Sequence, residues 1–244
     1  MSGQVRIGTS GWHYAHWRGP FYPERLPAGV MLGYYARHFD TVEVNNTHYC
    51  LPRPAVIEAW RDAVPAGFVF AVKASRYITH FHRLNPPFQR YGRFFEGIGG
   101  LGDRLGPVLF QLPPAFRRDD GRLDAFLGGL PISLRAAVEF RHPSWECAAV
   151  MELLACHDVA LAVTDLGGRL SPVQATASFA YVRLHGPRQA YTGSYDDRAL
   201  DDWSRQIRAW VAEDRQVFVY FDNDDKAMAV GDALRLKSRL ADAI

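Results

Sequence analysis

Cysteine is scarce in this chain of 244 residues, which contains only Cys50, Cys147 and Cys156. They form no Cys-x-x-Cys pair, and an odd number of cysteines leaves one unpaired, so a disulfide framework is not the basis of the fold. Long apolar runs are also missing, because no stretch approaches the roughly 18 residues that a membrane span needs. The sequence does not begin with a basic segment followed by an apolar one. We therefore expect a soluble, cytoplasmic protein without a membrane partner.

A strong excess of charge of one sign is missing too. The chain has 28 Lys and Arg against 26 Asp and Glu, for a net charge of +2. This balance falls short of the basic character of a dedicated nucleic-acid-binding domain, so any preference for an anion must be local. The content of hydrophobic residues, 48%, and of charged residues, 22%, is ordinary for a globular protein. The length matches the roughly 250 residues typical of one TIM barrel, and we expect a single domain over 1–244.

Eight short β-rich runs each end in polar or charged residues. The runs begin at Val5, Thr41, Phe68, Pro107, Ala136, Ala160, Ala180 and Val217. Helices are expected between most of them, at 31–38, 54–64, 88–97, 123–127, 146–156, 199–212 and 227–240. Such βα units assemble through right-handed crossovers into a parallel sheet. The predicted fold is an α/β TIM (β/α)8 barrel with eight parallel strands and an irregular crossover between strands six and seven, where 166–179 lacks a helical period.

Strand alternation selects the polar side chains that face the barrel axis, because residues two apart share a face. In the fifth run, apolar Ala136 and Val138 face the helices and leave Glu139 and Arg141 toward the axis. The same reasoning selects Glu43, Asn45, Lys73, Gln111, Asp165, Arg183, His185, Tyr220, Asp222 and Asp224. Active sites of TIM barrels lie at the carboxyl ends of the strands, so these residues are expected to share one mouth.

The cations of this set predict an anion-binding site. Lys73, Arg141 and Arg183 are suited to hold a phosphate or carboxylate, and the two arginines can do so bidentately. The candidates for proton transfer are Glu139, Asp165 and His185, with pKa values displaced by burial and by the neighbouring cations. The expected substrate-binding residues are Trp12, Glu43, Asn45, Lys73, Gln111, Arg141, Arg183, Tyr191, Asp222 and Asn223. A near balance of buried charges is also what a mutually paired scaffold without a ligand would have.

Two short motifs contain potential metal ligands. His80 and His82 are two residues apart after the third run, and the sequence Asp-Asn-Asp-Asp at 222–225 offers oxygen ligands of the kind that Mg²⁺ or Mn²⁺ prefers. A divalent metal is therefore a candidate cofactor, although side chains that cap helices or pack in loops have the same composition. The Gly-x-Gly-x-x-Gly motif at 97–102 follows an expected helix instead of a strand, which argues against dinucleotide binding. The chain has no Gly-x-Ser-x-Gly sequence for serine chemistry.

Taken together, seven motifs of this chain resemble the YecE-like family, domain of unknown function family 72, found in bacteria and archaea. They lie at 7–23, 41–49, 68–80, 106–116, 137–145, 181–186 and 219–224 and cover essentially the whole chain. The resemblance implies a TIM barrel and brings no assigned reaction. Where the family typically has Phe after Asn-x-Thr, this chain has His48, which places a titratable group near the second strand.

These observations predict an enzyme that acts on a phosphate-bearing substrate, either a small sugar-like molecule or a nucleic-acid phosphodiester, as a hydrolase or an isomerase-type barrel. The alternative is a non-catalytic barrel that binds an anion or another ligand. A catalyst needs an unpaired acid or base facing an open site, whereas a binding protein can have every carboxylate paired. Glycoside hydrolysis, which needs two carboxylates about 5 to 10 Å apart, is disfavoured by three cations in the same mouth. The oligomeric state stays open.

Overall fold

In the computed structural model, which describes residues 5–241, the eight expected runs form eight parallel strands. They are β1 (Val5–Thr9), β2 (Thr41–Val44), β3 (Val69–Lys73), β4 (Leu105–Gln111), β5 (Ala136–Glu139), β6 (Ala160–Leu166), β8 (Phe179–Leu184) and β9 (Gln216–Phe221). Their order in the sheet is β1-β9-β8-β6-β5-β4-β3-β2. The two outer strands of this order meet through a parallel bridge between Ser10 and Glu43, so the sheet curls into a nearly closed TIM-like barrel, as predicted.

The contact between β1 and β2 depends on a glycine and a tyrosine. A Cβ atom on Gly8 would lie 2.3 Å from the carbonyl oxygen of Thr41, so only glycine permits this approach. The hydroxyl of Tyr35 accepts a hydrogen bond from the Thr9 N–H at 2.9 Å and lies 3.1 Å from the Thr41 carbonyl oxygen, to which it donates. These contacts tie the two strands together beside the ends that carry Ser10 and Glu43.

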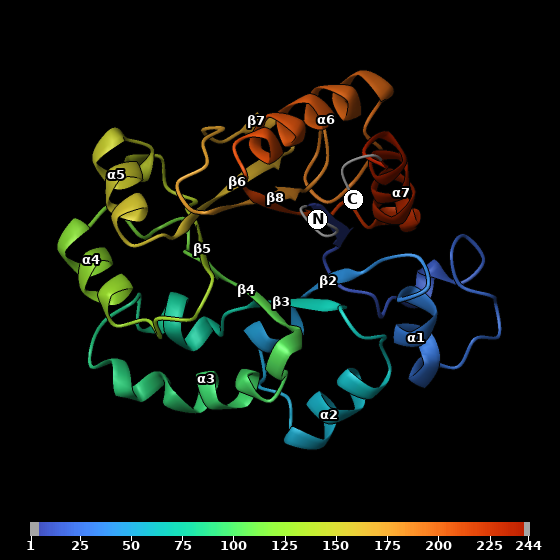
Figure 1. Ribbon diagram of the computed structural model, residues 1–244, viewed down its shortest axis with the longest axis horizontal. Coiled ribbons are helices and arrows are strands. Elements are labelled where there is room, and N and C mark those ends of the chain that lie inside the picture. Colours follow the sequence, from blue (N-terminus) through green and yellow to red (C-terminus); the bar gives the residue numbers. More distant parts are fainter. Residues whose placement is uncertain (1–4, 242–244) are drawn as a thin grey trace.

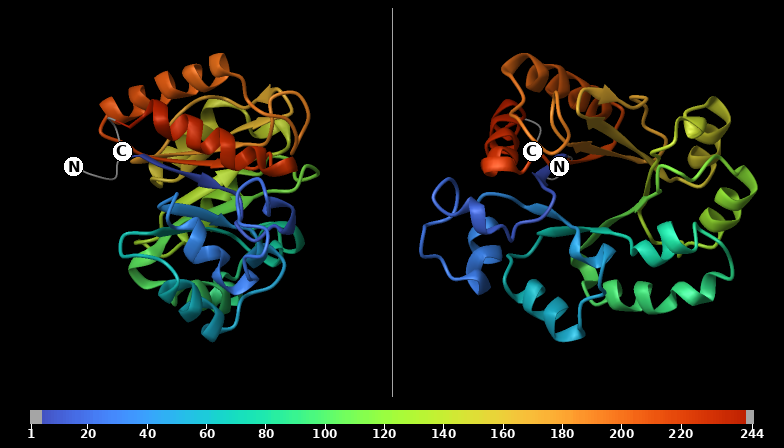
Figure 2. Two further views of the ribbon diagram at one scale, coloured as in Figure 1. Left: turned by 90° about the vertical axis from the view of Figure 1, so that its right-hand side faces the viewer. Right: turned by 180° about the vertical axis from the view of Figure 1, so that it is seen from behind.

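In the described part of the chain, the α-helices lie around the strands on the outside of the barrel (Figures 1 and 2). They are α1 (Met31–Tyr35), α2 (Pro54–Asp62), α3 (Gly92–Gly99), α4 (Asp120–Gly128), α5 (Ala148–Cys156), α6 (Asp197–Ala212) and α7 (Met228–Arg239). Local sequence explains several starts: Pro54 occupies the first turn of α2, and Asp196 caps α6 by accepting a hydrogen bond from the Ala199 N–H at 2.8 Å. Each helix expected from the sequence is present within a few residues of its predicted bounds.

The crossover between β6 and β8 contains no helix, as its sequence predicts. Instead, the short strand β7 (Arg169–Leu170) pairs antiparallel with the end of β6. This hairpin is a detail that the sequence analysis did not predict. It leaves a groove of about 460 Å³ between the crossover and α6.

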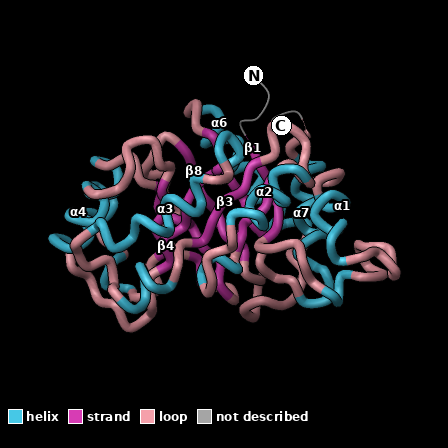
Figure 3. The backbone as a smooth tube through the Cα atoms, turned by 90° about the horizontal axis from the view of Figure 1, so that it is seen from below, coloured by secondary structure: helices cyan, strands magenta, loops and turns pink. Residues whose placement is uncertain are grey.

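The barrel interior has an apolar layer below a polar one. The apolar layer is built from strand residues that include Val69, Ala71, Leu109, Ala137, Ala162, Phe179 and Phe218. Two residues further along several of these strands, the same face carries Lys73, Gln111 and Glu139, so the polar groups collect at the carboxyl ends. Figure 3 shows the strands in the middle of the molecule with helices and loops outside them. Within residues 5–241, no helix is both long and apolar enough to cross a membrane.

Candidate functional site

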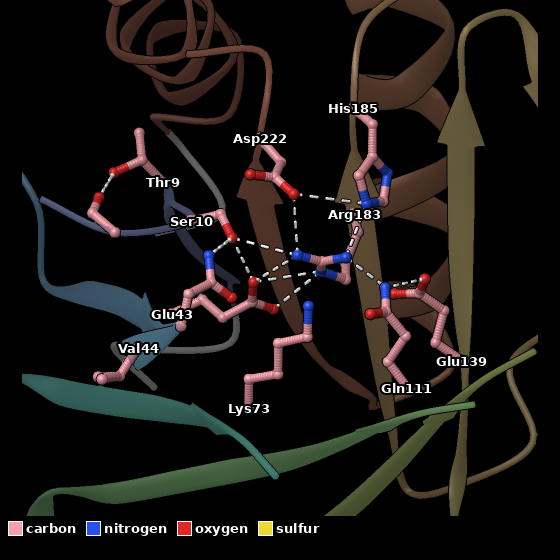
Figure 4. A network of polar contacts seen from close by, with 12 residues as sticks. Thr9, Ser10, Glu43, Val44, Lys73, Gln111, Glu139, Arg183, His185 and Asp222 are labelled. Carbon is pink, nitrogen blue, oxygen red and sulfur yellow. Dashed lines mark hydrogen bonds and ion pairs between the residues drawn. The ribbon is translucent and has the colours of Figure 1, made fainter. Parts of the chain in front are cut away.

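Arg183 of β8 lies at the centre of the polar layer, less than 2% exposed, and binds three carboxylates (Figure 4). Its Nε is 3.0 Å from Oε2 of Glu43, its Nη1 is 2.9 Å from Oε2 of Glu139, and its Nη2 is 3.0 Å from Oδ2 of Asp222. Nη2 also contacts Oε1 of Glu43 at 2.7 Å and Oγ of Ser10 at 3.1 Å. These acceptors occupy the whole guanidinium group, so Arg183 organises the site and presents no free N–H to an anion.

Glu43 is fully buried and fully paired. Besides Arg183 it accepts hydrogen bonds from the Tyr181 hydroxyl at 2.6 Å and from the Ser10 hydroxyl, which in turn accepts from Nδ2 of Asn45 at 2.6 Å. Burial by itself would raise the pKa of Glu43, but the charge of Arg183 and these hydrogen bonds hold it below its ordinary value. Glu43 is therefore an ionised anchor for the network.

Tyr181 and Ser10 were not among the predicted site residues. Tyr181 lies two residues before Arg183 on the same strand, so the alternation that selected Arg183 also selects it. Ser10 follows β1, whose small residues fit either register, and its orientation is visible only in the structure.

Glu139 of β5 is the second ionised anchor. Its Oε1 accepts a hydrogen bond from Nε2 of Gln111 at 2.7 Å and pairs with Nε of Arg141. Burial would raise the pKa of Glu139, yet the charges of Arg183 and Arg141 lower it well below its ordinary value. The predicted neighbours Gln111, Glu139 and Arg141 are thus in direct contact.

His185 is buried and neutral. Its Nε2 lies 2.6 Å from Nη1 of Arg183 and 3.3 Å from Nη2 of Arg141. Arginine nitrogens only donate hydrogen bonds, so Nε2 must accept and the ring proton lies on Nδ1. Burial, followed by the charge of Arg183, lowers the pKa of His185 well below its ordinary value. Among the described residues Nδ1 has no hydrogen-bond partner.

Lys73 and Asp222 make fewer contacts than the fully paired groups around them. The amine of Lys73 makes no hydrogen bond or ion pair with any residue of 5–241, and burial lowers the pKa of this half-buried lysine, as does the charge of Arg183. In Figure 4 it points toward the network with no contact drawn to it. Asp222 follows β9, and its side chain is 15% exposed. Burial raises its pKa to about 6 against the opposing charge of Arg183. Within the polar layer, Lys73 is therefore suited to bind a ligand and Asp222 to exchange a proton.

Asp165 does not join this site, contrary to the expectation that it faces the axis. In the register of β6 with β8, Thr164 lies opposite Arg183 and Asp165 opposite Leu184, so Asp165 faces the helices. Leu161 of the same strand has the same parity and also faces outward. Asp165 accepts a hydrogen bond from the Gly168 N–H at 3.2 Å and lines the groove beside α6.

Asn223, expected to bind substrate, is also turned away from the axis. It is fully buried, and its Nδ2 donates to the carbonyl of Gly193 at 2.7 Å and to Oδ2 of Asp232 in α7 at 2.8 Å. Asp232 also accepts from the Tyr195 N–H at 2.9 Å and from the Ser194 hydroxyl at 2.6 Å. Asn223 and Asp232 therefore hold the loop that follows β8. No sequence pattern pointed to Asp232.

The two predicted aromatic contacts lie in different surroundings. Trp12 is 9% exposed and packs edge-on against Trp60, with ring centroids 5.4 Å apart. It lines a small hollow of about 60 Å³ with Asn45. Tyr191 is 48% exposed, and its ring centroid is 5.6 Å from that of His185. Of the two, Tyr191 is the one accessible to a ligand beside the polar layer.

The two histidines of the first potential metal motif contact other side chains. Nδ1 of His80 lies 2.9 Å from the Thr79 hydroxyl, and Nδ1 of His82 lies 2.8 Å from Nη1 of Arg90. No group of three or more His, Cys, Asp or Glu side chains within 5–241 is placed to hold a metal ion.

Comparisons with known proteins agree with the fold. The family model described as "Protein of unknown function DUF72" matches residues 6–244. The UPF0759 protein YecE of Escherichia coli K12 is 33% identical over 143 residues, which cover 58% of this chain and 50% of that protein, so the match spans about half of that relative's length. The UPF0759 protein YunF of Bacillus subtilis is 25% identical over 90% of this chain and 89% of that protein.

Solved structures give the same result. The crystal structure of a DUF72 family protein (TM1631) from Thermotoga maritima superposes with a TM-score of 0.87 at 28% identity, covering 97% of this chain and 99% of that one. A DUF72 family protein (EF0366) from Enterococcus faecalis has the same fold, with a TM-score of 0.83 at 20% identity over 97% of this chain and 95% of that chain. With the family model matching nearly its full length, this chain belongs to the DUF72 family, the YecE-like family of unknown function.

Proposed function

We propose that this protein is an enzyme that acts on a phosphate-bearing substrate at the carboxyl ends of its strands. The observation that carries the proposal is the contrast between Lys73 and the groups around it. Glu43 and Glu139 are locked to Arg183, whereas the Lys73 amine has no partner among the described residues. The charges of Glu43, Glu139 and Asp222 act on the Lys73 amine, but within 5–241 its N–H groups have no acceptor, so they are available to donate hydrogen bonds to a bound anion.

In this proposal Lys73 and Arg141 bind the anion. Lys73 is half-buried and Arg141 has a side chain that is 14% exposed, so both reach solvent at the mouth. A phosphoryl oxygen held by the Lys73 amine would be stabilised as negative charge develops on it. Arg141 keeps its Nε on Glu139, and its Nη2 lies 3.3 Å from Nε2 of His185.

Proton transfer is assigned to Asp222. Its pKa of about 6 lies near neutral pH, where a carboxylate that accepts a proton from an attacking hydroxyl is most effective. Asp222 accepts from Arg183 through Oδ2, and its Oδ1 has no hydrogen bond within 5–241. His185 and Glu139 are less suited, because Nε2 of His185, its one acceptor, already accepts from Arg183 and Glu139 is held ionised by two arginines. In this proposal Glu139 and His185 are positioning residues that keep Arg183 and Arg141 in place.

A binding and turnover experiment tests the proposal. Inorganic phosphate should raise the melting temperature of the wild type by mass action, and this rise should be absent in Lys73→Gln but retained in Lys226→Gln, an exposed lysine after β9. Sugar phosphates, p-nitrophenyl phosphate and its diester should then be screened for turnover. Asp222→Asn should keep the phosphate response and lose turnover. Turnover that is unchanged in both Lys73→Gln and Asp222→Asn would overturn the assignment.

A non-catalytic anion-binding barrel is the second candidate. The pairing of Glu43 and Glu139 with Arg183 favours it, because a binding protein needs no free carboxylate. It predicts the same phosphate response and its loss in Lys73→Gln, but no turnover of any ester. The screen therefore separates the two candidates.

A further inference from the structure

Exposed aromatic side chains gather at the mouth of the barrel. Within residues 5–241, the exposed Phe, Tyr and Trp side chains are Tyr49 at 71%, Tyr77 at 46%, Phe81 at 65% and Tyr191 at 48%. Tyr49 follows β2, Tyr77 and Phe81 follow β3, and Tyr191 follows β8. All four lie on loops at the carboxyl ends of strands, which is where the candidate site lies. Core packing does not account for side chains that are this exposed.

An arginine lies over two of these aromatic rings. The guanidinium carbon of Arg76 lies 5.7 Å from the ring centroid of Tyr49 and 5.1 Å from that of Phe81. Tyr77 and Phe81 begin and end a π-helical turn, Tyr77–Phe81, directly after Arg76. Arg76 has no carboxylate partner in the described part of the chain. We call Tyr49, Arg76, Tyr77 and Phe81 the aromatic patch.

The segments that carry the aromatic patch contain no acidic residue. Between Glu43 and Glu58, and again between Asp62 and Glu96, the sequence has no Asp or Glu. The basic residues of these two segments are Arg53, Lys73, Arg76, Arg83, Arg90 and Arg93. The net charge of the whole chain is only +2, so these two segments carry a local excess of positive charge. A local field of this kind attracts a polyanion to one side of the mouth.

The aromatic patch is adjacent in sequence to Lys73 of the candidate site. Lys73 ends β3 three residues before Arg76. His48 contacts the segment between them: its Nδ1 is 2.9 Å from the Ala74 carbonyl oxygen, and burial, with smaller contributions from Lys73 and Arg76, lowers its pKa to about 4. The ring of His48 also packs against His80 of the π-helical turn, with centroids 5.0 Å apart.

We propose that the aromatic patch binds single-stranded nucleic acid, with bases stacked on Tyr49 and Phe81 and phosphates held by Arg76 and the neighbouring basic residues, so that a phosphodiester reaches Lys73. Aromatic faces interleaved with cations are the usual means of binding a single strand, because its bases are free to stack on protein side chains. In a duplex the bases are already stacked on one another. This inference rests on the proposed function and names its substrate class.

Fluorescence anisotropy with a labelled 15-nucleotide single strand and the matching duplex tests the inference on the full-length protein. The single strand should bind more tightly than the duplex. Tyr49→Ala and Phe81→Ala should each weaken binding on the order of 10-fold. Arg76→Gln should weaken binding and lower the slope of log K against log salt concentration by about 1.

Two matched controls lie at the opposite end of the barrel. Ile132 is a fully exposed hydrophobic residue in the turn before β5, and Arg37 lies over the ring of Tyr34, 5.8 Å from its centroid, before β2. Ile132→Ala and Arg37→Gln should bind the oligonucleotide like the wild type. No binding at low salt, tighter binding of the duplex, or equal binding by the patch and control variants would overturn the inference.

Failure of this inference is distinguishable from failure of the proposed function. If inorganic phosphate still raises the melting temperature through Lys73 and small phosphate esters are turned over, while oligonucleotide binding is absent or unaffected by the patch variants, only the substrate class is wrong. If Lys73→Gln neither loses the phosphate response nor alters turnover, the proposed function itself fails. Oligonucleotide binding that is lost with Tyr49→Ala, Phe81→Ala and Arg76→Gln supports the inference.

Discussion

Replacement of Arg183 by methionine should destabilise the protein strongly. Arg183 pairs with both Glu43 and Glu139, and both glutamates are 0% exposed. Methionine has a similar length and fills the space of the arginine stem, but it carries no charge. The variant must therefore fold with two buried carboxylates that have lost their main counter-ion, or with those carboxylates protonated.

The size of the effect follows from the burial of the pair. Removing one partner of a buried ion pair typically costs about 3 to 5 kcal/mol, which is a large share of the 5 to 15 kcal/mol by which a typical protein is stable. For a chain of this length each kcal/mol lowers the melting temperature by about 2 to 4 °C, so the expected loss is roughly 6 to 20 °C. Because Arg183 keeps the pKa values of Glu43 and Glu139 low, its removal raises both, and protonation relieves the penalty as the pH falls. The loss should be smaller at pH 5 than at pH 7.

Urea unfolding followed by circular dichroism at the two pH values measures this loss. Arg205→Met is the matched control, because Arg205 is 72% exposed and pairs with Asp202 on the surface of α6, so its removal should cost less than about 1 kcal/mol. If Arg183→Met yields too little folded protein, Arg183→Lys keeps the charge and should lose less. A free energy of unfolding within about 1 kcal/mol of the wild type for Arg183→Met would refute this reasoning.

Three further expectations concern other parts of the molecule. Gly8→Ala places a Cβ atom 2.3 Å from a carbonyl oxygen of β2 and should lower the free energy of unfolding in urea by about 1 to 3 kcal/mol. Gly29→Ala, whose Cβ atom would have no neighbour within 4 Å, should leave this free energy unchanged. Asp232→Ala removes the acceptor of the Tyr195 N–H and should cost about 1 to 3 kcal/mol, with faster hydrogen exchange in the loop after β8; unchanged exchange would contradict this. For the turnover that we propose, kcat/KM should rise with pH through about 6 as Asp222 ionises. This rise of kcat/KM with pH should be absent in Asp222→Asn.

The polar layer is the part of the site that strand alternation predicted best. Glu43, Lys73, Glu139 and Arg183 each stand between apolar residues that face the helices, so a period of two settles their direction without any tertiary information. The same rule places Asp165 outward, because it lies four residues after outward-facing Leu161 on the same strand. The expectation that Asp165 faces inward did not follow this rule.

The hydrogen-bond partners of these side chains could not be predicted in the same way. Alternation says that Arg183 faces the axis, but the acceptors of its N–H groups depend on strand order and register, which bring Glu43, Glu139 and Asp222 from three other strands to one guanidinium. For that reason Arg183 was expected to be a ligand contact and is instead enclosed, while Lys73 has no protein partner among the described residues.

The aromatic patch also depends on three-dimensional information. Tyr49 and Phe81 belong to loops after different strands, and their separation in sequence gives no sign that Arg76 lies over both rings. Whether an aromatic residue in a loop packs or remains exposed depends on the shape of the loop. Trp12 is buried against Trp60 although its loop has a similar composition. Only the absence of acidic residues around these loops was visible in the sequence.

A crystal structure of the protein with phosphate, and a second with tungstate as an anomalous scatterer, would test the central claim most directly. The account predicts an oxyanion within hydrogen-bonding distance of the Lys73 amine, next to Arg141 and Asp222, with Arg183 still bound to its three carboxylates. An empty site under both conditions, with the Lys73 amine bound to Glu43 or Glu139, would contradict the account.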